Sequence, residues 1–245
     1  MNRSVAIAAV ALVLVLGLGW WFMRAPAETP VAAEVPAPVV AAPAEEPPAP
    51  EPLPALVDSD DLARELARGF GALGEPADGV LAQEGLVRRF VRVVDAVASG
   101  GSPASDLGTL APEEPFNVVE TGEQVFVDPS SYDRYDDVAA GIARVDADEA
   151  VAAYRLIEPL ADEVYSEMVG DSQAFRPVLM RALSALLAVP MPQDPPELVD
   201  AINRYRYADT ALESLSLSQK HLLRMGPANI GRVQARLRQI ARLLG

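Results

Sequence analysis

Leu86-Val-Arg-Arg-Phe-Val-Arg-Val-Val-Asp-Ala-Val-Ala98 is the stretch of sequence that decides the fold. Its apolar side chains recur every three or four positions, with charged residues between them, at Leu86, Val87, Phe90, Val94 and Val97. This period places the apolar side chains on one face of an α-helix. We therefore expect an amphipathic helix that begins near Val80 and ends at the glycines after Ala98.

The same period continues on both sides of this stretch. It predicts a mainly α fold, a compact multi-helix domain over residues 55–245. The other expected helices cover residues 59–73, 129–142, 147–169, 172–188, 197–207, 217–225 and 228–244. Capping-box patterns support two of the helix starts, at Asp146 with Glu149 and at Ser216 with Gln219. Phe116–Val127 is rich in β-formers around a glycine turn, which predicts one small β-hairpin.

The N-terminal residues 1–24 predict a transmembrane anchor. Val5–Met23 is an uninterrupted run of uncharged residues between Arg3 and Arg24, and it is long enough to cross a bilayer as a helix. Trp20 and Trp21 close the run, where indole rings favour the interface between membrane and water.

A cleaved signal peptide is the alternative for this segment, because Ala-Pro-Ala follows at residues 25–27. The length of the apolar run and its bulky aromatic end argue for an anchor instead. The positive-inside rule then places the N-terminus in the cytoplasm. We expect a single-pass protein of the inner (cytoplasmic) membrane, with its domain on the periplasmic side, and the absence of cysteine fits an oxidising compartment.

Residues 25–54 predict a disordered linker, because they are almost entirely Ala, Pro, Val and Glu. The proline content prevents helix formation and favours extended polyproline II. Two functions remain open for this segment: a semi-rigid stalk that lifts the domain off the membrane, or a plain tether.

Charge is distributed unevenly along the chain. The net charge of −15 argues against nucleic acid as a partner. From Gln219 onward, however, there is no Asp or Glu, and the basic residues are Lys220, Arg224, Arg232, Arg236, Arg238 and Arg242. The last helix could bind an anionic partner or, if it is undocked, a lipid surface. The alternative, which we favour, is that the last helix packs against the acidic body of its own domain.

Several collinear stretches resemble DUF3014, a bacterial family without an established activity. They are Arg88-Arg89-Phe90-Val91, Tyr132-Asp133-Arg134-Tyr135, Tyr154-Arg155, Tyr207-Ala208-Asp209 and Gln219–Pro227. The resemblance implies a membrane segment, a Pro-rich linker and this helical domain, but no mechanism and no site residues. Where the family typically has Leu after the Lys, this chain has His221, which makes His221 a poor catalytic candidate.

Polar and aromatic residues recur near the predicted helix starts. The candidate binding residues among them are Arg134, Tyr135, Tyr154, Tyr207, Asp209, Lys220 and Arg224. These residues either make structural hydrogen bonds inside the domain, the interpretation we favour, or form a groove for a peptide or glycan.

The sequence predicts no catalytic residue, no cofactor and no metal site. A single histidine and the absence of cysteine leave no ligand set for zinc, and clustered acids such as Asp58, Asp60 and Asp61 fit the first turns of helices. We therefore expect an envelope protein whose domain binds a protein or a cell-wall partner without catalysis. The alternative is a cell-wall hydrolase that uses two carboxylates.

Overall fold

The structure is a computed structural model that describes residues 53–56, 59–68, 75–112, 114–201 and 204–245. The predicted anchor at residues 1–24 and the linker at 25–54, apart from its last two residues, lie outside the described part of the chain. Among the described helices, none combines the length and the apolar character that a membrane crossing requires.

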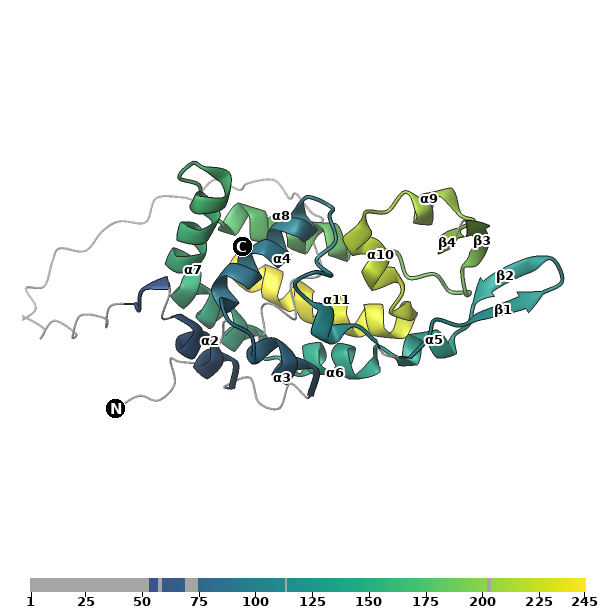
Figure 1. The fold of residues 1–245 in the computed structure, drawn as a ribbon, viewed down its shortest axis with the longest axis horizontal. Helices are drawn as coiled ribbons and strands as arrows, with labels where there is room; N and C mark the ends of the chain where they lie inside the picture. The colour runs from purple at the N-terminus through teal and green to yellow at the C-terminus, as the bar shows by residue number, and fades with distance from the viewer. Residues whose placement is uncertain (1–52, 57–58, 69–74, 113, 202–203) are drawn as a thin grey trace, which may run out of the picture.

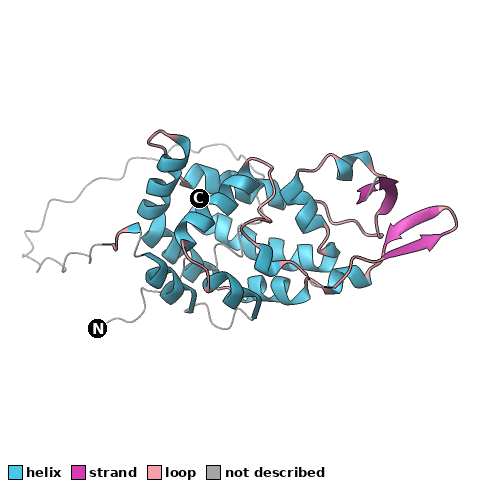
Figure 2. Ribbon diagram, in the orientation of Figure 1, coloured by secondary structure: helices cyan, strands magenta, loops and turns pink. Residues whose placement is uncertain are grey.

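The described chain is mainly helical, as the sequence predicted, with a small β-sheet at one end of an elongated body (Figures 1 and 2). The helices are α2 (Ser59–Arg68), α3 (Glu75–Leu81), α4 (Leu86–Ala98), the 3-10 turn η2 (Gly108–Leu110), α5 (Ser130–Asp133), α6 (Asp136–Arg144), α7 (Ala147–Val169), α8 (Arg176–Leu187), α9 (Thr210–Glu213), α10 (Leu217–Leu223) and α11 (Gly226–Leu244).

The core lies between α4, α7, α8 and α11. The predicted apolar face of α4 is confirmed: each of its members is at most 3 % exposed. This face packs against α7 and α8, and the ring of Phe90 meets that of Phe175 edge to face, with centroids 5.5 Å apart. Helix α11 packs on α6, α7 and α8 and buries Ile230, Val233, Leu237, Ile240 and Leu244.

The helix expected from Val80 is divided in two. Helix α3 ends at Leu81 and α4 begins at Leu86, because Gly85 takes a left-handed conformation with φ of 66°. The carboxylate of Asp60 on α2 accepts the backbone N–H groups of Gly85 (2.7 Å) and Leu86 (2.8 Å). This acid, predicted to lie in the first turn of its own helix, therefore also caps the start of α4.

The two predicted capping patterns mark real helix starts. The carboxylate of Asp146 accepts the N–H groups of Asp148 and Glu149 and opens α7, which continues through Pro159 to Val169. Ser216 and Gln219 form the complete capping box of α10. The helix expected over residues 129–142 is interrupted and forms α5 and α6.

The sheet corrects one prediction. The expected hairpin is present as β1 (Val118–Thr121) and β2 (Gln124–Val127). The helix predicted over residues 197–207 is wrong, since this segment forms β3 (Glu197–Ala201) and β4 (Arg204–Tyr207), and all four strands join in the antiparallel order β1-β2-β3-β4. Pairing of Val125 with Leu198, and of Leu198 with Tyr207, turns these side chains toward the core and decides the strand conformation.

Candidate functional site

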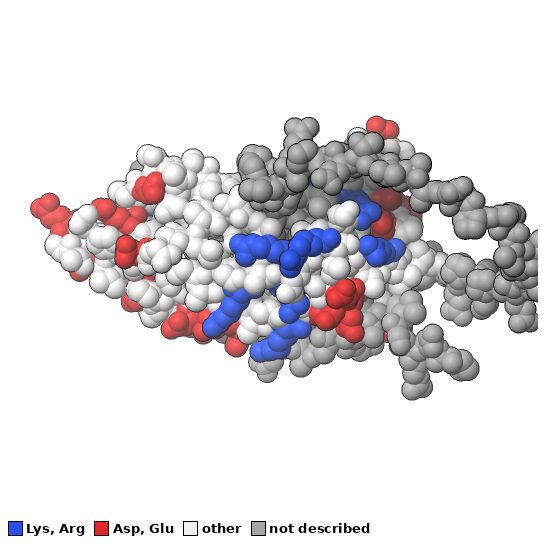
Figure 3. Space-filling model, turned by 180° about the vertical axis from the view of Figure 1, so that it is seen from behind, with Lys and Arg blue, Asp and Glu red and all other residues white. Residues whose placement is uncertain are grey.

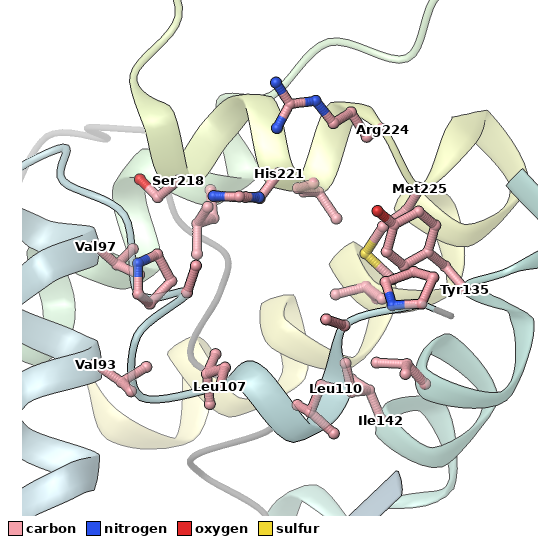
Figure 4. Close-up of a pocket in the computed structure, with 18 of the residues that line it drawn as sticks. Val93, Val97, Leu107, Leu110, Tyr135, Ile142, Ser218, His221, Arg224 and Met225 are labelled. Atoms are coloured by element: carbon pink, nitrogen blue, oxygen red, sulfur yellow. The ribbon is translucent and has the colours of Figure 1, made fainter. Parts of the chain in front are cut away.

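A cavity of about 370 Å³, which we call the central cavity, lies between α4, the segment 103–112 with η2, α6 and α10 (Figure 4). Most of its lining side chains are apolar. The lining residues are Val93, Val97, Pro103, Ala104, Leu107, Gly108, Leu110, Ala111, Pro112, Tyr135, Val138, Ile142, Leu186, Ser218, His221, Leu222, Arg224, Met225 and Val233.

Helix α10 supplies the polar wall of the cavity. The capping box at Ser216 fixes where the helix begins, and the side-chain amide of Gln219 donates to the backbone oxygen of Ala185 (2.6 Å), which ties α10 to α8. Ser218 and His221 lie one helical turn apart and therefore share a face, which borders the cavity in Figure 4. Local capping thus positions the polar groups of the site.

His221 joins α10 to the segment that follows α4. Its Nε2 lies 2.9 Å from the hydroxyl of Ser102. Burial, and then the nearby Arg224, lower the pKa of His221 from its usual 6.5 and favour the neutral imidazole. Sequence reasoning missed Ser102 because the two residues are 119 positions apart. Within the described part of the chain no carboxylate hydrogen-bonds to His221, so the pair lacks the third group that orients a catalytic histidine.

Arg224 stands at the edge of the cavity beside His221 (Figure 4). It is exposed, and no described carboxylate pairs with it. The neighbouring cations differ: the Lys220 ammonium contacts Oε1 of Glu213 at 2.8 Å, and Nε of Arg206 lies 3.5 Å from the same oxygen. Arg224 therefore leaves an uncompensated positive charge where the cavity meets solvent.

The structure brings five of the seven predicted binding residues into one neighbourhood. Tyr135 and Arg224 line the cavity, and the guanidinium of Arg134 lies 5.3 Å from the centre of the Tyr135 ring. Burial raises the pKa of Tyr207 to about 12, against the opposing charge of Arg224. Lys220 belongs to the same neighbourhood because it pairs with Glu213, and the other carboxylate oxygen of Glu213 accepts the backbone N–H of Tyr207 (3.1 Å).

The other two predicted residues lie apart from this group. Tyr154 is fully buried against Phe90, and its hydroxyl donates to Glu158 (3.3 Å). Burial first, and Glu158 second, raise its pKa. Asp209 caps α9 by accepting the N–H of Ala211 (2.7 Å). Tyr154 and Asp209 thus make their contacts inside the domain and do not line the cavity. The cavity itself was not predicted from the sequence.

The basic C-terminal helix is docked, so the condition for its use on a lipid surface is not met. Seen from behind, Lys and Arg side chains gather over the middle of the body (Figure 3). Arg232 contacts a carboxylate, that of Asp136 at 3.4 Å. At the other end of α11, Arg155 and Arg176 donate to the backbone oxygens of Leu243 and Leu244. These contacts satisfy orphan carbonyls at the negative end of the helix dipole.

The described residues contain no group of three or more His, Cys, Asp or Glu side chains placed to hold a metal ion. The central cavity is a mostly apolar pocket with one polar wall.

Comparison with known proteins gives the family. A family model described as a protein of unknown function, DUF3014, matches residues 86–241, and the chain belongs to this family. No curated protein and no solved structure matches the chain. All the cavity-lining residues, from Val93 to Val233, fall inside the matched region. The cavity is therefore built within the family domain.

Proposed function

We propose that this domain is a non-catalytic binding module that takes an apolar group of its partner into the central cavity. The volume of about 370 Å³ and the largely apolar lining carry the proposal. Ligand sites are typically concave, mostly apolar and furnished with few polar groups. An apolar cavity of about 150 Å³ accommodates benzene, so this cavity has room for a group about twice that size.

The contacts of the acids support binding over hydrolysis. A glycoside hydrolase needs two carboxylates roughly 5–10 Å apart on either side of the bond that it cleaves. Asp60, Asp146 and Asp209 each bind backbone N–H groups at a helix start. Among the described residues that line the cavity, none is Asp or Glu. The cavity offers a hydrolase no acid pair, so the hydrolase alternative gains no support from it.

The proposed setting is the bacterial envelope. We place the anchor at residues 5–23 in the inner membrane and the domain on its periplasmic side, with a protein or another envelope component as the partner. Because the lining is apolar, the inserted group is an apolar side chain or an acyl chain. A sugar would lose its hydrogen bonds with water there and regain few of them.

The experiment uses the ε-methyl groups of methionine as reporters in the full-length protein in lipid nanodiscs. Met225 lines the cavity, whereas Met168 and Met191 are exposed elsewhere. Titration with decanol should shift the methyl NMR signal of Met225 saturably and leave the other two in place; the variant Met225→Leu assigns the signal. No shift, or equal shifts of all three signals, would contradict binding in the cavity. Release of soluble sugars from purified wall material would contradict the non-catalytic part.

A further inference from the structure

Three residues with polar side chains form the polar wall of the central cavity. Ser218, His221 and Arg224 follow one another at intervals of three residues, and all three line the cavity, Ser218 and His221 from α10 and Arg224 from the residue that ends it. The hydroxyl of Ser218 is hydrogen-bonded to that of Ser216 (3.0 Å), and Nε2 of His221 to that of Ser102 (2.9 Å). The guanidinium of Arg224, which can only donate, has no hydrogen bond to another described side chain. This wall is suited to a group that accepts hydrogen bonds.

The charge on this wall is positive. Glu213 pairs with the neighbouring cations Lys220 and Arg206, and it also accepts the backbone N–H of Tyr207. Arg224 has no such partner among the described residues, although the whole chain is strongly acidic. A charged hydrogen bond from guanidinium to carboxylate is about twice as strong as a neutral one. An anionic group therefore complements this position.

The opposite wall is apolar. Its side chains come from α4 (Val93), from η2 and the residue before it (Leu110 and Leu107) and from α6 (Ile142). All of them face α10 across the cavity in Figure 4. Scaled from benzene in about 150 Å³, a cavity of this volume holds roughly 12–15 non-hydrogen atoms. This size suits a medium-length alkyl chain.

On the basis of the proposed function, we infer that the ligand is a small anionic amphiphile, a carboxylate with a medium-length alkyl chain. The chain fills the space between Val93, Leu110 and Ile142, and the carboxylate lies against Arg224 where the cavity opens. Apolar burial supplies the affinity, and the guanidinium selects the charge of the head group.

The test compares three ligands that share one alkyl chain, decanoate, decanol and decylammonium, by the Met225 methyl signal of the full-length protein in nanodiscs. Decanoate should bind about tenfold more tightly than decanol, because it adds a charge-assisted hydrogen bond. Decylammonium should bind more weakly than decanol, since it places a like charge beside Arg224. Equal affinities for decanoate and decanol would overturn the inference.

Two matched pairs of variants locate the effect. Arg224→Gln should weaken decanoate binding about tenfold and decanol binding far less, whereas Arg181→Gln, at another exposed arginine that does not line the cavity, should change neither. Ala104→Trp, at an exposed lining position, should weaken both ligands, and Ala188→Trp, at an exposed position just after α8, should weaken neither. Equal loss in Arg224→Gln and Arg181→Gln would assign the preference to the surface charge in general and overturn the inference.

The outcomes also separate the inference from the proposed function. If decanol and decanoate both shift Met225 with one affinity, the cavity binds apolar groups and only the charge preference is wrong. If no ligand shifts Met225, both statements are wrong.

Discussion

Position 226 requires glycine, both for its backbone conformation and because an aromatic ring lies against it. Its φ of 79° lies in the left-handed region, and a Cβ atom there would overlap the ring of Tyr132. Tyr132 in turn belongs to α5, so this contact fixes the start of α11 against the segment that leads into α6. The motif Gly226-Pro227 suggested a helix boundary in the sequence, but only the packing shows why no side chain fits.

Replacing Gly226 by Ala should lower the free energy of unfolding by about 1–3 kcal/mol, because it adds both overlap and an unfavourable φ. Gly231→Ala is the control in the same helix: its Cβ would lie at an ordinary 3.9 Å from Sδ of Met191, and Ala stabilises a helix relative to Gly. Urea unfolding of the two variants measures the difference. Equal stabilities would refute this account of Gly226.

His221 should make stability depend on pH. Burial, and then Arg224, lower the pKa of His221 in the folded protein below the usual 6.5. At a pH between the folded-state pKa and 6.5, the unfolded chain therefore binds a proton that the folded chain does not. The free energy of unfolding therefore falls as the pH drops below 6.5 toward the folded-state pKa. Urea titrations at about pH 7 and about pH 5 should show a smaller fall in His221→Leu than in the parent protein. The same fall in both proteins would show that His221 is not the titrating group.

At the scale of elements, capping and apolar periodicity identified most helices. The apolar stripe located α4, and the patterns at Asp146 and Ser216 located the starts of α7 and α10. These signals are local, because a cap and the first turn that it satisfies lie within four residues.

The strands β3 and β4 could not be predicted in this way. Leu198, Ile202 and Tyr205 have a spacing that also fits a helix, and we expected one. Pairing with β2, more than seventy positions earlier in the chain, decided the outcome. The alternation of Tyr205, Arg206 and Tyr207 was the available sequence signal for a strand.

Asp60 provides a test of whether a side chain on α2 stabilises the start of α4. Its carboxylate accepts two N–H groups at the start of α4, whereas the neighbouring Asp61 has a side chain that is 97 % exposed and contacts Arg64 only. Asp60→Ala should lower the free energy of unfolding by about 1–2 kcal/mol. Asp61→Ala should change it by less than about 0.5 kcal/mol. Thermal unfolding compares the two, and similar losses would mean that the cap on α4 contributes little.

At the scale of the whole molecule, the sequence predicted the mainly helical class and the family, but not the central cavity. The cavity arises where residues of α4, η2, α6 and α10 meet, and only tertiary packing brings Val93 close to His221. The segment 103–112 gave no regular pattern in the sequence, and it forms one wall of the site. Concavity is a property of packed elements, so a single sequence carries no direct signal of it.

The membrane arrangement is a prediction at the same scale. The apolar run at residues 5–23 and the flanking arginines predict that the domain lies outside the inner membrane. A reporter active only in the periplasm, fused after Gly245, should be active, and a cytoplasmic reporter at the same place should be silent. The reverse pattern would contradict the proposed topology.

The most direct measurement of the central claim is the position of a bound ligand. In the full-length protein with decanoate, nuclear Overhauser contacts should join the terminal methyl group of the ligand to the methyl groups of Val93 and Leu110, and the methylene beside the carboxylate should lie near Arg224. Contacts only with exposed methyl groups such as those of Met168 and Met191, or none with the cavity, would contradict the account.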